Sequence, residues 1–250
     1  MHPALAQLEH RPYALKRSPW LISMQWLDLL FAHWRVDKAA LRALLPTGLA
    51  LDTFDGSAWI GIVPFTMRGI RARGTPPMPL VSAFHELNVR TYVRSTRDDR
   101  PGVWFFSLDA ASRLAVRAAR ASFSLPYFDA RMTLSRRGER IDYTSERTHR
   151  GVPPASFDAS YHPTGPVLPP SEPGTLEHFL TERYCLYAAT RRGRVLRGEI
   201  HHAPWPLQPA ECEFRVNAMT EQIGLGLPDE PPLLHFARRI EVVAWPARRV

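Results

Sequence analysis

One stretch of the chain, residues 84–93, alternates so regularly that it constrains the fold more than any other feature. Side chains on a β-strand point to opposite faces with a period of two residues. One face of this stretch carries Leu87, Val89 and Val93. The other face carries three polar side chains between two aromatic ones: Phe84, Glu86, Asn88, Arg90 and Tyr92. The pattern predicts a strand of an antiparallel sheet.

The polar face of this strand has two interpretations. In an ordinary antiparallel sheet one face packs on the core and the other contacts water. A carboxylate, an amide and a guanidinium in register between aromatic rings would also suit a pocket that orients a small polar ligand. The alternation alone leaves both interpretations open.

Shorter segments with similar signals fill the rest of the chain. The predicted strands cover 21–36, 49–54, 57–67, 84–94, 103–108, 127–135, 140–148, 184–190, 194–202 and 240–245. The Asp55-Gly56 pair between two apolar runs predicts a hairpin. Short helices are predicted at 38–45, from 110 to about 122, and at 176–183, with Asp37, Asp109 and Thr175 as their N-caps.

The 24 prolines fall mainly between these segments, and the region 151–173 is predicted to be one long loop. Many short strands with shaped connections are typical of a sandwich or a partly open barrel with a few helices. No repeat or long linker divides the chain. We therefore predict a polar N-terminal tail over residues 1–18 and a single domain over residues 19–250.

Composition limits the classes of partner. The net charge of +8 comes almost entirely from arginine, because Lys16 and Lys38 are the only lysines. The arginines are scattered rather than gathered with aromatic residues, so we expect no specific nucleic-acid partner. No apolar segment is long enough to span a bilayer and no signal peptide is evident, which predicts a cytoplasmic protein without a membrane partner. A homo-oligomer is left open.

Motifs for metal or cofactor binding are missing from the sequence. Cys185 and Cys212 are too few for a disulfide framework, and no zinc spacing of Cys or His occurs. His201 and His202 are adjacent on a predicted strand and would point to opposite faces. The sequence also has no nucleophile elbow, P-loop or dinucleotide fingerprint. We predict no metal and no organic cofactor.

Several motifs in a fixed order nevertheless resemble a known family. They are His33-Trp34, Pro46 with Gly48, Asp55-Gly56, Pro64-Phe65, Phe84-x-Glu86-x-Asn88-x-Arg90-Thr91-Tyr92-Val93, Trp104 to Ala110, Leu125-Pro126-Tyr127-Phe128, Glu182-Arg183-Tyr184 and His202-x-Pro204-Trp205. This set resembles the YqjF-like family of uncharacterised bacterial proteins, domain of unknown function 2071, from about Trp20 to Trp245. That family looks related to acetoacetate decarboxylase. The resemblance implies a mostly β (α+β) fold in which curved antiparallel sheets form a cone or partly open barrel around a central cavity.

The resemblance also aligns two positions with the decarboxylase active site. The stretch from Ala119-Arg120 to Pro126-Tyr127 matches the spacing of the decarboxylase motif that ends in the Schiff-base lysine, and Phe84-x-Glu86 matches its active-site glutamate. Here Tyr127 and Phe128 stand where the decarboxylase has lysines. A Schiff base needs a primary amine with a lowered pKa. We therefore predict a protein that does not use imine chemistry.

If the sheet encloses a cavity, the polar face of residues 84–92 points inward. We then predict Glu86 and Tyr127 as catalytic residues, and a ligand-binding set of Asn88, Arg90, Tyr92, Arg120 and Arg183. The expected ligand is a small metabolite that bears a carbonyl or a carboxylate. The alternative is a non-catalytic ligand-sensing or structural module in which Glu86 and Arg90 form a buried ion pair.

Overall fold

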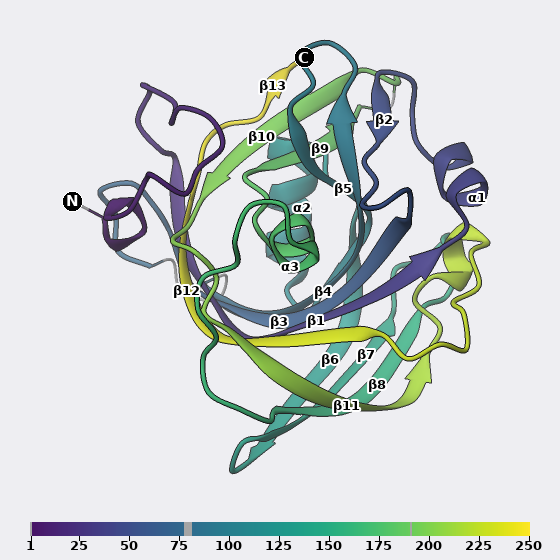
Figure 1. Cartoon of the computed structure of the whole chain (residues 1–250). Helices are drawn as coiled ribbons and strands as arrows, with labels where there is room; N and C mark the ends of the chain where they lie inside the picture. The colour runs from purple at the N-terminus through teal and green to yellow at the C-terminus, as the bar shows by residue number, and fades with distance from the viewer. Residues whose placement is uncertain (1, 78–81, 191) are drawn as a thin grey trace.

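The computed structural model describes residues 2–77, 82–190 and 192–250 (Figure 1). In this part of the chain thirteen strands belong to one continuous sheet. The strands are β1 Ile22–Val36, β2 Leu49–Leu51, β3 Ala58–Ala72, β4 Ala83–Ser95, β5 Pro101–Ala110, β6 Tyr127–Arg137, β7 Arg140–Arg147, β8 Ser156–Pro163, β9 Cys185–Ala189, β10 Val195–His201, β11 Leu207–Asn217, β12 Leu233–Ala244 and β13 Arg248–Arg249. The helices are short: η1 Pro3–Leu5, α1 Lys38–Ala43, α2 Arg113–Phe123, α3 Leu176–Thr181 and η2 Glu221–Ile223.

The strand pairings close the described part of the sheet into two circuits that share five strands. The first is a ring of seven strands, β12-β1-β3-β4-β5-β9-β10, which closes through a β10–β12 pairing. The second is a barrel of nine strands that runs from β5 through β6, β7, β8 and β11 back to β12 and the shared strands. The predicted mostly β, curved fold is therefore confirmed.

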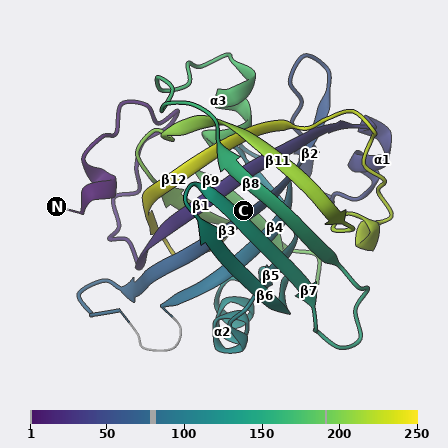
Figure 2. The same ribbon diagram turned by 90° about the horizontal axis from the view of Figure 1, so that it is seen from below.

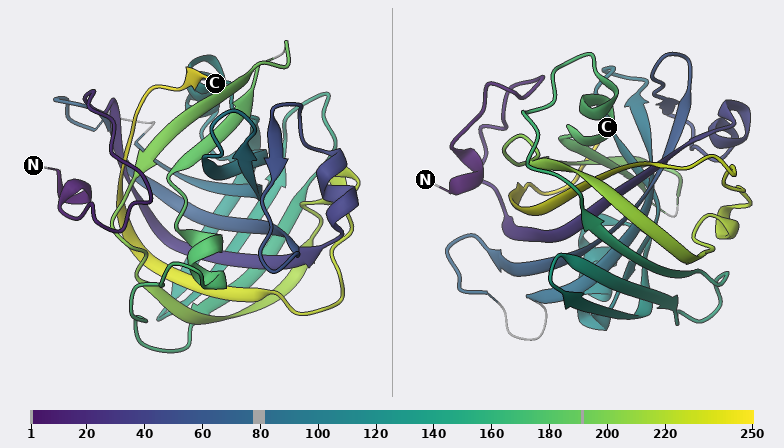
Figure 3. Two further views of the ribbon diagram at one scale, coloured as in Figure 1. Left: turned by 45° about the horizontal axis from the view of Figure 1, so that its top comes forward. Right: turned by 60° about the horizontal axis from the view of Figure 1, so that its bottom comes forward.

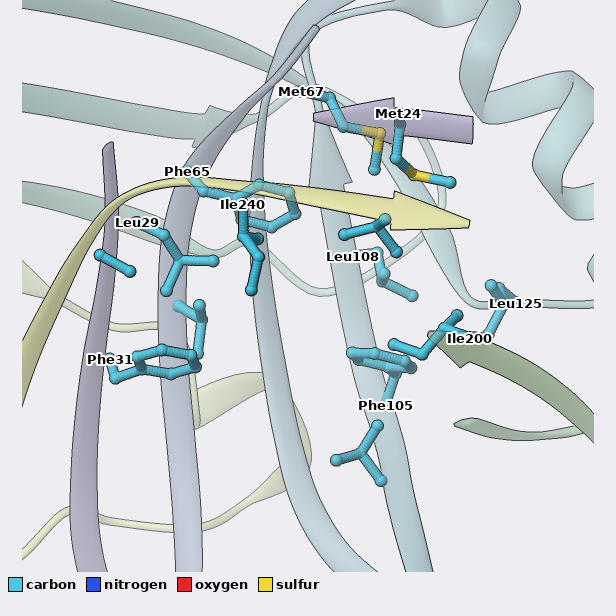
Figure 4. Packing of buried hydrophobic residues seen from close by; sticks show 14 of the residues in the cluster. Met24, Leu29, Phe31, Phe65, Met67, Phe105, Leu108, Leu125, Ile200 and Ile240 are labelled. Carbon is cyan, nitrogen blue, oxygen red and sulfur yellow. The ribbon is translucent and has the colours of Figure 1, made fainter. Parts of the chain in front are cut away.

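Each circuit encloses a separate apolar core. The shared strands direct one face into the seven-strand ring, where Phe31, Phe65 and Phe105 pack with other apolar side chains (Figure 4). Their other face packs against Tyr143 and Phe157 of β7 and β8. Figures 2 and 3 show β6, β7, β8 and β11 as a second layer on one side of the shared strands. In Figure 1 α3 lies within the outline of the seven-strand ring, and Figure 2 shows α2 at the opposite end.

Two of the three predicted helix starts are confirmed. Asp37 accepts a hydrogen bond from the Ala40 backbone N–H, and Thr175 accepts one from that of His178. The prediction for Asp109 is wrong: this residue lies in β5, and Ser112 caps α2 instead. The side chain of Asp109 is held away from the helix by a buried ion pair with Arg147.

The predicted strands are largely confirmed, but the structure has two strands that were not predicted, and one predicted pairing is wrong. The Asp55-Gly56 turn forms with one isolated bridge, while β2 pairs with β4 rather than with β3. The predicted loop 151–173 contains β8, and no strand was predicted over the residues of β11. Proline occurs within both strands, at Pro163 and Pro209, and proline normally disfavours a strand.

The N-terminal segment packs on the outside of the domain. Arg11 is buried, bonds the Ile200 carbonyl and pairs with Glu199 of β10. The Trp245 indole donates a hydrogen bond to the Ser18 carbonyl. Within the described residues, no helix has the length and apolar character needed to cross a membrane.

Candidate functional site

Glu86 and Tyr127 meet inside the seven-strand ring. The Tyr127 hydroxyl donates a 2.9 Å hydrogen bond to Glu86 Oε2, and the glutamate side chain is almost fully buried. Burial raises the pKa of Glu86 to about 8, against the opposing effect of the Tyr127 hydrogen bond and with a smaller contribution from Asp109. Glu86 is therefore an acid that keeps its proton at neutral pH and can exchange it near that pH.

The turn between α2 and β6 brings Tyr127 to this position. Ser124 ends α2 in the left-handed conformation, with a φ of 52°, which redirects the chain. Tyr127 then begins β6 in parallel register with Leu108 of β5. Because β5 lies beside β4, the tyrosine side chain reaches Glu86 across one intervening strand.

Arg90 is the second polar group of the interior, and it has no counter-charge among the residues that the structure describes. Its side chain is 8% exposed, and its guanidinium donates one hydrogen bond of 3.2 Å, to the Leu180 carbonyl of α3. Its Nε has no partner, and the guanidinium lies against the rings of Phe31 and Tyr92 at 5.1 and 5.9 Å. No carboxylate in the described part of the chain forms an ion pair with it.

The buried Glu86–Arg90 ion pair of our alternative hypothesis is thus absent. The two residues are four positions apart on β4, which separates their Cα atoms by about 13 Å. Glu86 turns towards Tyr127 of β6, whereas Arg90 turns towards Phe31 of β1. The side chains lean away from each other across the sheet.

Tyr92 and His33 are hydrogen-bonded to each other at the end of the interior that α3 covers. The Tyr92 hydroxyl donates to the Leu180 carbonyl at 2.8 Å and lies 2.6 Å from His33 Nε2. Burial, followed by the charge of Arg90, lowers the pKa of His33 well below its ordinary value. A neutral His33 that donates through Nε2 fits this arrangement and leaves its buried Nδ1 without a partner.

A glycine of β3 makes room for this pair. A Cβ atom on Gly61 would stand 3.0 Å from the His33 ring and 3.4 Å from the Arg90 side chain.

His33 and Trp59 also line a hollow of about 390 Å³, whose rim includes residues of segment 228–233. A second hollow, of about 540 Å³, lies on the outside around Asp37 and Arg42. Neither hollow is lined by Glu86 or Arg90.

Asn88 lies on β4 between the two polar ends. It is 5% exposed, and its Oδ1 is buried without a hydrogen-bond partner. Buried amide oxygens in proteins are nearly always hydrogen-bonded. Together with Arg90 Nε, it gives the interior two unsatisfied polar atoms on one strand face.

The two other predicted arginines, Arg120 and Arg183, are each bound by other groups of the protein. Arg183 is buried, but it pairs with Asp52 at 2.7 Å and stacks on Phe179. Arg120 is exposed at the end of α2 and donates to the backbone carbonyl of Tyr127. The structure therefore brings Glu86 together with Tyr127, and it brings both Arg90 and Arg183 to the ring of Tyr92. Arg120 meets this set only at the backbone of Tyr127.

Two interior groups were not among the predicted site residues. His33 had a signal only as part of the His33-Trp34 motif, and its contact with Tyr92 joins residues 59 positions apart. Glu182 accepts hydrogen bonds from the Trp205 backbone N–H and the Tyr184 hydroxyl. No cluster of three metal-ligating side chains occurs among the residues that the structure describes.

Comparison with known proteins places the chain in a family. The model of DUF2071, described as an uncharacterised conserved protein, matches residues 23–241. The chain belongs to the DUF2071 family. Within this family, the uncharacterised protein YqjF of Bacillus subtilis (strain 168) is 47% identical over 230 residues, which cover 92% of this chain and 93% of YqjF. The resemblance seen in the sequence motifs is confirmed.

Solved structures of more distant proteins share the fold. The enduracididine biosynthesis enzyme MppR, in complex with the condensation product of pyruvate and imidazole 4-carboxaldehyde, superposes with a TM-score of 0.66 at 14% identity. The match covers 93% of this chain and 90% of MppR. Acetoacetate decarboxylase from Legionella pneumophila gives a TM-score of 0.62 at 14% identity and covers 96% and 91% of the two chains. The DUF2071 chain therefore has an acetoacetate decarboxylase-like fold.

Proposed function

We propose that the interior of the seven-strand ring binds a small metabolite that bears a carboxylate or a carbonyl. In this proposal Arg90 and Asn88 hold the ligand, and Glu86 and Tyr127 act on it as a proton-transfer pair. The reaction proceeds without an imine and without a cofactor.

The observation that carries the proposal is the isolated charge of Arg90. A guanidinium stays protonated in proteins, and its burial without an anion is unfavourable. A ligand carboxylate would supply the missing charge and could accept two parallel hydrogen bonds from the guanidinium. The unpartnered Asn88 Oδ1 on the same strand face would accept a hydrogen bond from a ligand donor.

The Glu86–Tyr127 pair supports proton transfer as the reaction class. A general acid or base works best when its pKa lies near the working pH, and the pKa of Glu86 is about 8. Burial, the charge of Glu86 and the hydrogen bond to it raise the pKa of Tyr127 well above its ordinary value. Tyr127 therefore acts as a hydrogen-bond donor to Glu86 or to a ligand oxygen.

The positions of the two lysines argue against an imine route. Lys16 lies 3.8 Å from Glu199, on the face of β10 opposite to the interior residue Ile200. Lys38 is exposed at the first position of α1. Tyr127 occupies the interior position at which the related decarboxylase motif has its lysine, and a phenol cannot form a Schiff base.

The structural relatives favour the same ligand class. The MppR structure contains a condensation product of pyruvate, and the Legionella protein is named for acetoacetate. Both named compounds are small oxo acids. At 14% identity these names guide the choice of compounds for a screen.

The proposal is tested by a thermal-shift screen of small carboxylic and oxo acids, because a ligand specific to the native state raises the melting temperature. A hit should lose its effect in Arg90→Met. Arg90→Met itself should leave the stability unchanged or raise it, since it removes a buried charge that has no protein partner. The matched control is Arg147→Met, which leaves Asp109 unpaired and should cost about 3–5 kcal/mol.

Two results would contradict the proposal. One is an Arg90→Met variant as destabilised as Arg147→Met, which would make Arg90 a structural residue. The other is a hit that binds Arg90→Met as tightly as the native protein. A hit that is recovered unchanged after incubation would instead support the ligand-sensing alternative over an enzyme.

A further inference from the structure

One buried carboxylate outside the ring interior is surrounded by four cations. Glu199 of β10 is 1% exposed, and its Oε2 lies 3.4 Å from the Arg11 guanidinium. Its Oε1 faces three further cations, Arg100, Arg248 and Lys16, at 3.2, 3.4 and 3.8 Å. Four positive charges therefore meet one negative charge, which leaves an excess of three positive charges.

Segments that are distant in the sequence bring these cations together. Arg11 and Lys16 belong to the N-terminal segment, and Arg100 immediately precedes β5. Arg248 begins β13, which pairs with β10 (Figure 1). The Tyr13 ring contacts two of the cations, because the Arg11 and Arg100 guanidinium carbons lie 4.6 and 4.2 Å from its centroid. The cluster therefore forms only when the chain is folded.

Neighbouring carboxylates do not neutralise this excess. Asp98 and Asp99, in the turn before β5, pair with other arginines. Among the described residues, Glu199 is the only carboxylate that forms ion pairs with the four cations. Burial lowers the pKa of Lys16, and the charge of Arg248 lowers it further, against the attraction of Glu199. The cluster therefore lacks anions for the cations that it holds.

The geometry at Glu199 Oε1 leaves hydrogen-bond donors free for a further anion. Charge-assisted hydrogen bonds are usually about 2.7–2.9 Å long, and none of the three contacts to this oxygen is that short. A guanidinium carries several N–H donors. In the described part of the chain, Arg100 and Arg248 each donate a hydrogen bond to Glu199 alone. The Arg100, Arg248 and Lys16 side chains are 25%, 54% and 14% exposed, so solvent reaches all three.

The shared oxygen also limits how far apart the three cations are. The distance between any two of their charged nitrogens is at most the sum of two contacts to Oε1, or about 7 Å. One tetrahedral oxyanion that accepts hydrogen bonds of about 3 Å on two or three sides can bridge cations at this spacing. A nucleic acid binds through a row of many phosphates, whereas these cations are gathered at one point.

We propose that Lys16, Arg100 and Arg248 form a binding site for one small oxyanion, either inorganic phosphate or the phosphoryl group of a metabolite. Glu199 holds the three cations in place before the anion binds, and Arg11 compensates its charge at the other carboxylate oxygen. A phosphoryl group carries a charge of about −1.5 to −2 at neutral pH, which offsets more than half of the excess. The site lies on the opposite face of β10 from the interior residue Ile200 and goes beyond the proposed function.

Calorimetric titration of the full-length protein with inorganic phosphate tests the site. At pH 7 phosphate and sulfate are expected to bind and to raise the melting temperature, whereas choline chloride at the same ionic strength is not. Arg248→Gln should weaken phosphate binding by about tenfold or more, because it removes a charge-assisted hydrogen bond. Lys16→Gln should weaken binding to a similar extent, and Lys16→Arg, which keeps the charge, should retain most of the affinity.

Arg131→Gln is the matched control. Arg131 is an exposed arginine of β6 that pairs with Glu146, so its replacement changes the net charge by the same amount at a different place. This variant should bind phosphate as tightly as the native protein. Glycerol phosphate distinguishes the two sources of the anion: tighter binding than inorganic phosphate supports a phosphorylated metabolite, and equal or weaker binding supports the free ion.

Three results would overturn the proposal. The first is a native protein that binds neither phosphate nor glycerol phosphate. The second is phosphate binding that Arg131→Gln and Arg248→Gln weaken equally, because such binding would depend on net charge alone. The third is single-stranded DNA that binds more tightly than glycerol phosphate with the same dependence on Arg248, which would make the cluster a nucleic-acid surface.

Discussion

Ionisable side chains are buried in three different ways in this protein: in an ion pair, in the neutral form, or as a charge without a counter-ion. Asp109 and Arg147 form an ion pair, and Arg147 also contacts the Gln222 side chain. Glu86 forms no ion pair with a cation in the described part of the chain and keeps its proton, because burial raises its pKa to about 8. Arg90 cannot lose its proton, and its guanidinium contacts a backbone carbonyl and aromatic rings but forms no ion pair with a carboxylate of the described residues. The charge of Arg90 is therefore the observation on which the proposed ligand rests.

The raised pKa of Glu86 predicts a pH dependence of stability. Between its ordinary value of 4.5 and about 8, the folded protein holds one proton on Glu86 that the unfolded chain has released. The free energy of unfolding should therefore fall as the pH rises through this window, by up to about 1.4 kcal/mol per pH unit from this group. Glu86→Gln should remove that slope.

Urea unfolding of both proteins at several pH values between 5 and 9 measures the difference. The gap between Glu86→Gln and the native protein should shift in favour of the variant as the pH rises, and become constant above about pH 8. A gap that stays constant across the whole window would show that Glu86 is ionised in the folded protein.

The closure of the seven-strand ring depends on short pairings between elements. β5 and β9 pair in parallel at only two positions, Val103↔Leu186 and Trp104↔Tyr187. Gly102 precedes them, and a Cβ atom there would stand 2.7 Å from both the Cys185 carbonyl and the Tyr187 ring. The missing side chain lets the backbone of β5 approach β9.

Gly102→Ala is therefore expected to destabilise the protein, by about 1–3 kcal/mol, because neither the carbonyl nor the buried ring can move without strain. Thermal unfolding followed by circular dichroism measures the loss. Gly226→Ala is the matched control, since nothing lies within 4 Å of the added methyl group there. Equal melting temperatures for Gly102→Ala and the native protein would show that the β5–β9 contact is looser than described.

At the scale of the whole molecule, arginine dominates the charge and the two lysines are kept out of the ring interior. Arg197, from the densest arginine cluster of the sequence, is buried in an ion pair with Asp98. Lys16 pairs with Glu199, where Arg11 and Arg100 also bind. This distribution leaves neither lysine beside Glu86 or Tyr127.

We therefore predict that the protein forms no stoichiometric imine with acetoacetate or another β-keto acid. Borohydride reduction in the presence of such an acid would convert an imine to a stable adduct, which intact mass spectrometry detects. The native mass should persist. An adduct on Lys16 or Lys38 that accompanies turnover would refute this prediction, and Lys16→Arg and Lys38→Arg would identify the amine.

Local patterns in the sequence were sufficient for much of the fold. The alternation over residues 84–93 predicted β4 and the shared face of Glu86, Asn88 and Arg90, because the geometry of one strand fixes that alternation. The caps of α1 and α3 were predicted because a capping side chain bonds a backbone group only three residues away. The assignment of Tyr127 and Glu86 to one site came from the family resemblance, since nothing local relates positions 41 residues apart.

Only the tertiary structure decided which neighbours these residues meet. The sequence predicted Asp109 as a helix cap, but β7 places Arg147 beside it and the two form an ion pair. The Glu86–Arg90 ion pair of our alternative hypothesis is absent, because Glu86 contacts Tyr127 of β6 and Arg90 contacts Phe31 of β1. The ring closes through pairings between distant segments, which no short-range pattern encodes. The sequence by itself determined most of the strands, with β8 and β11 as exceptions, and the face on which the polar residues of β4 lie. Because the sheet closes into a ring, this face of β4 lies inside the protein. The same closure buries Arg90 without a counter-charge among the described residues.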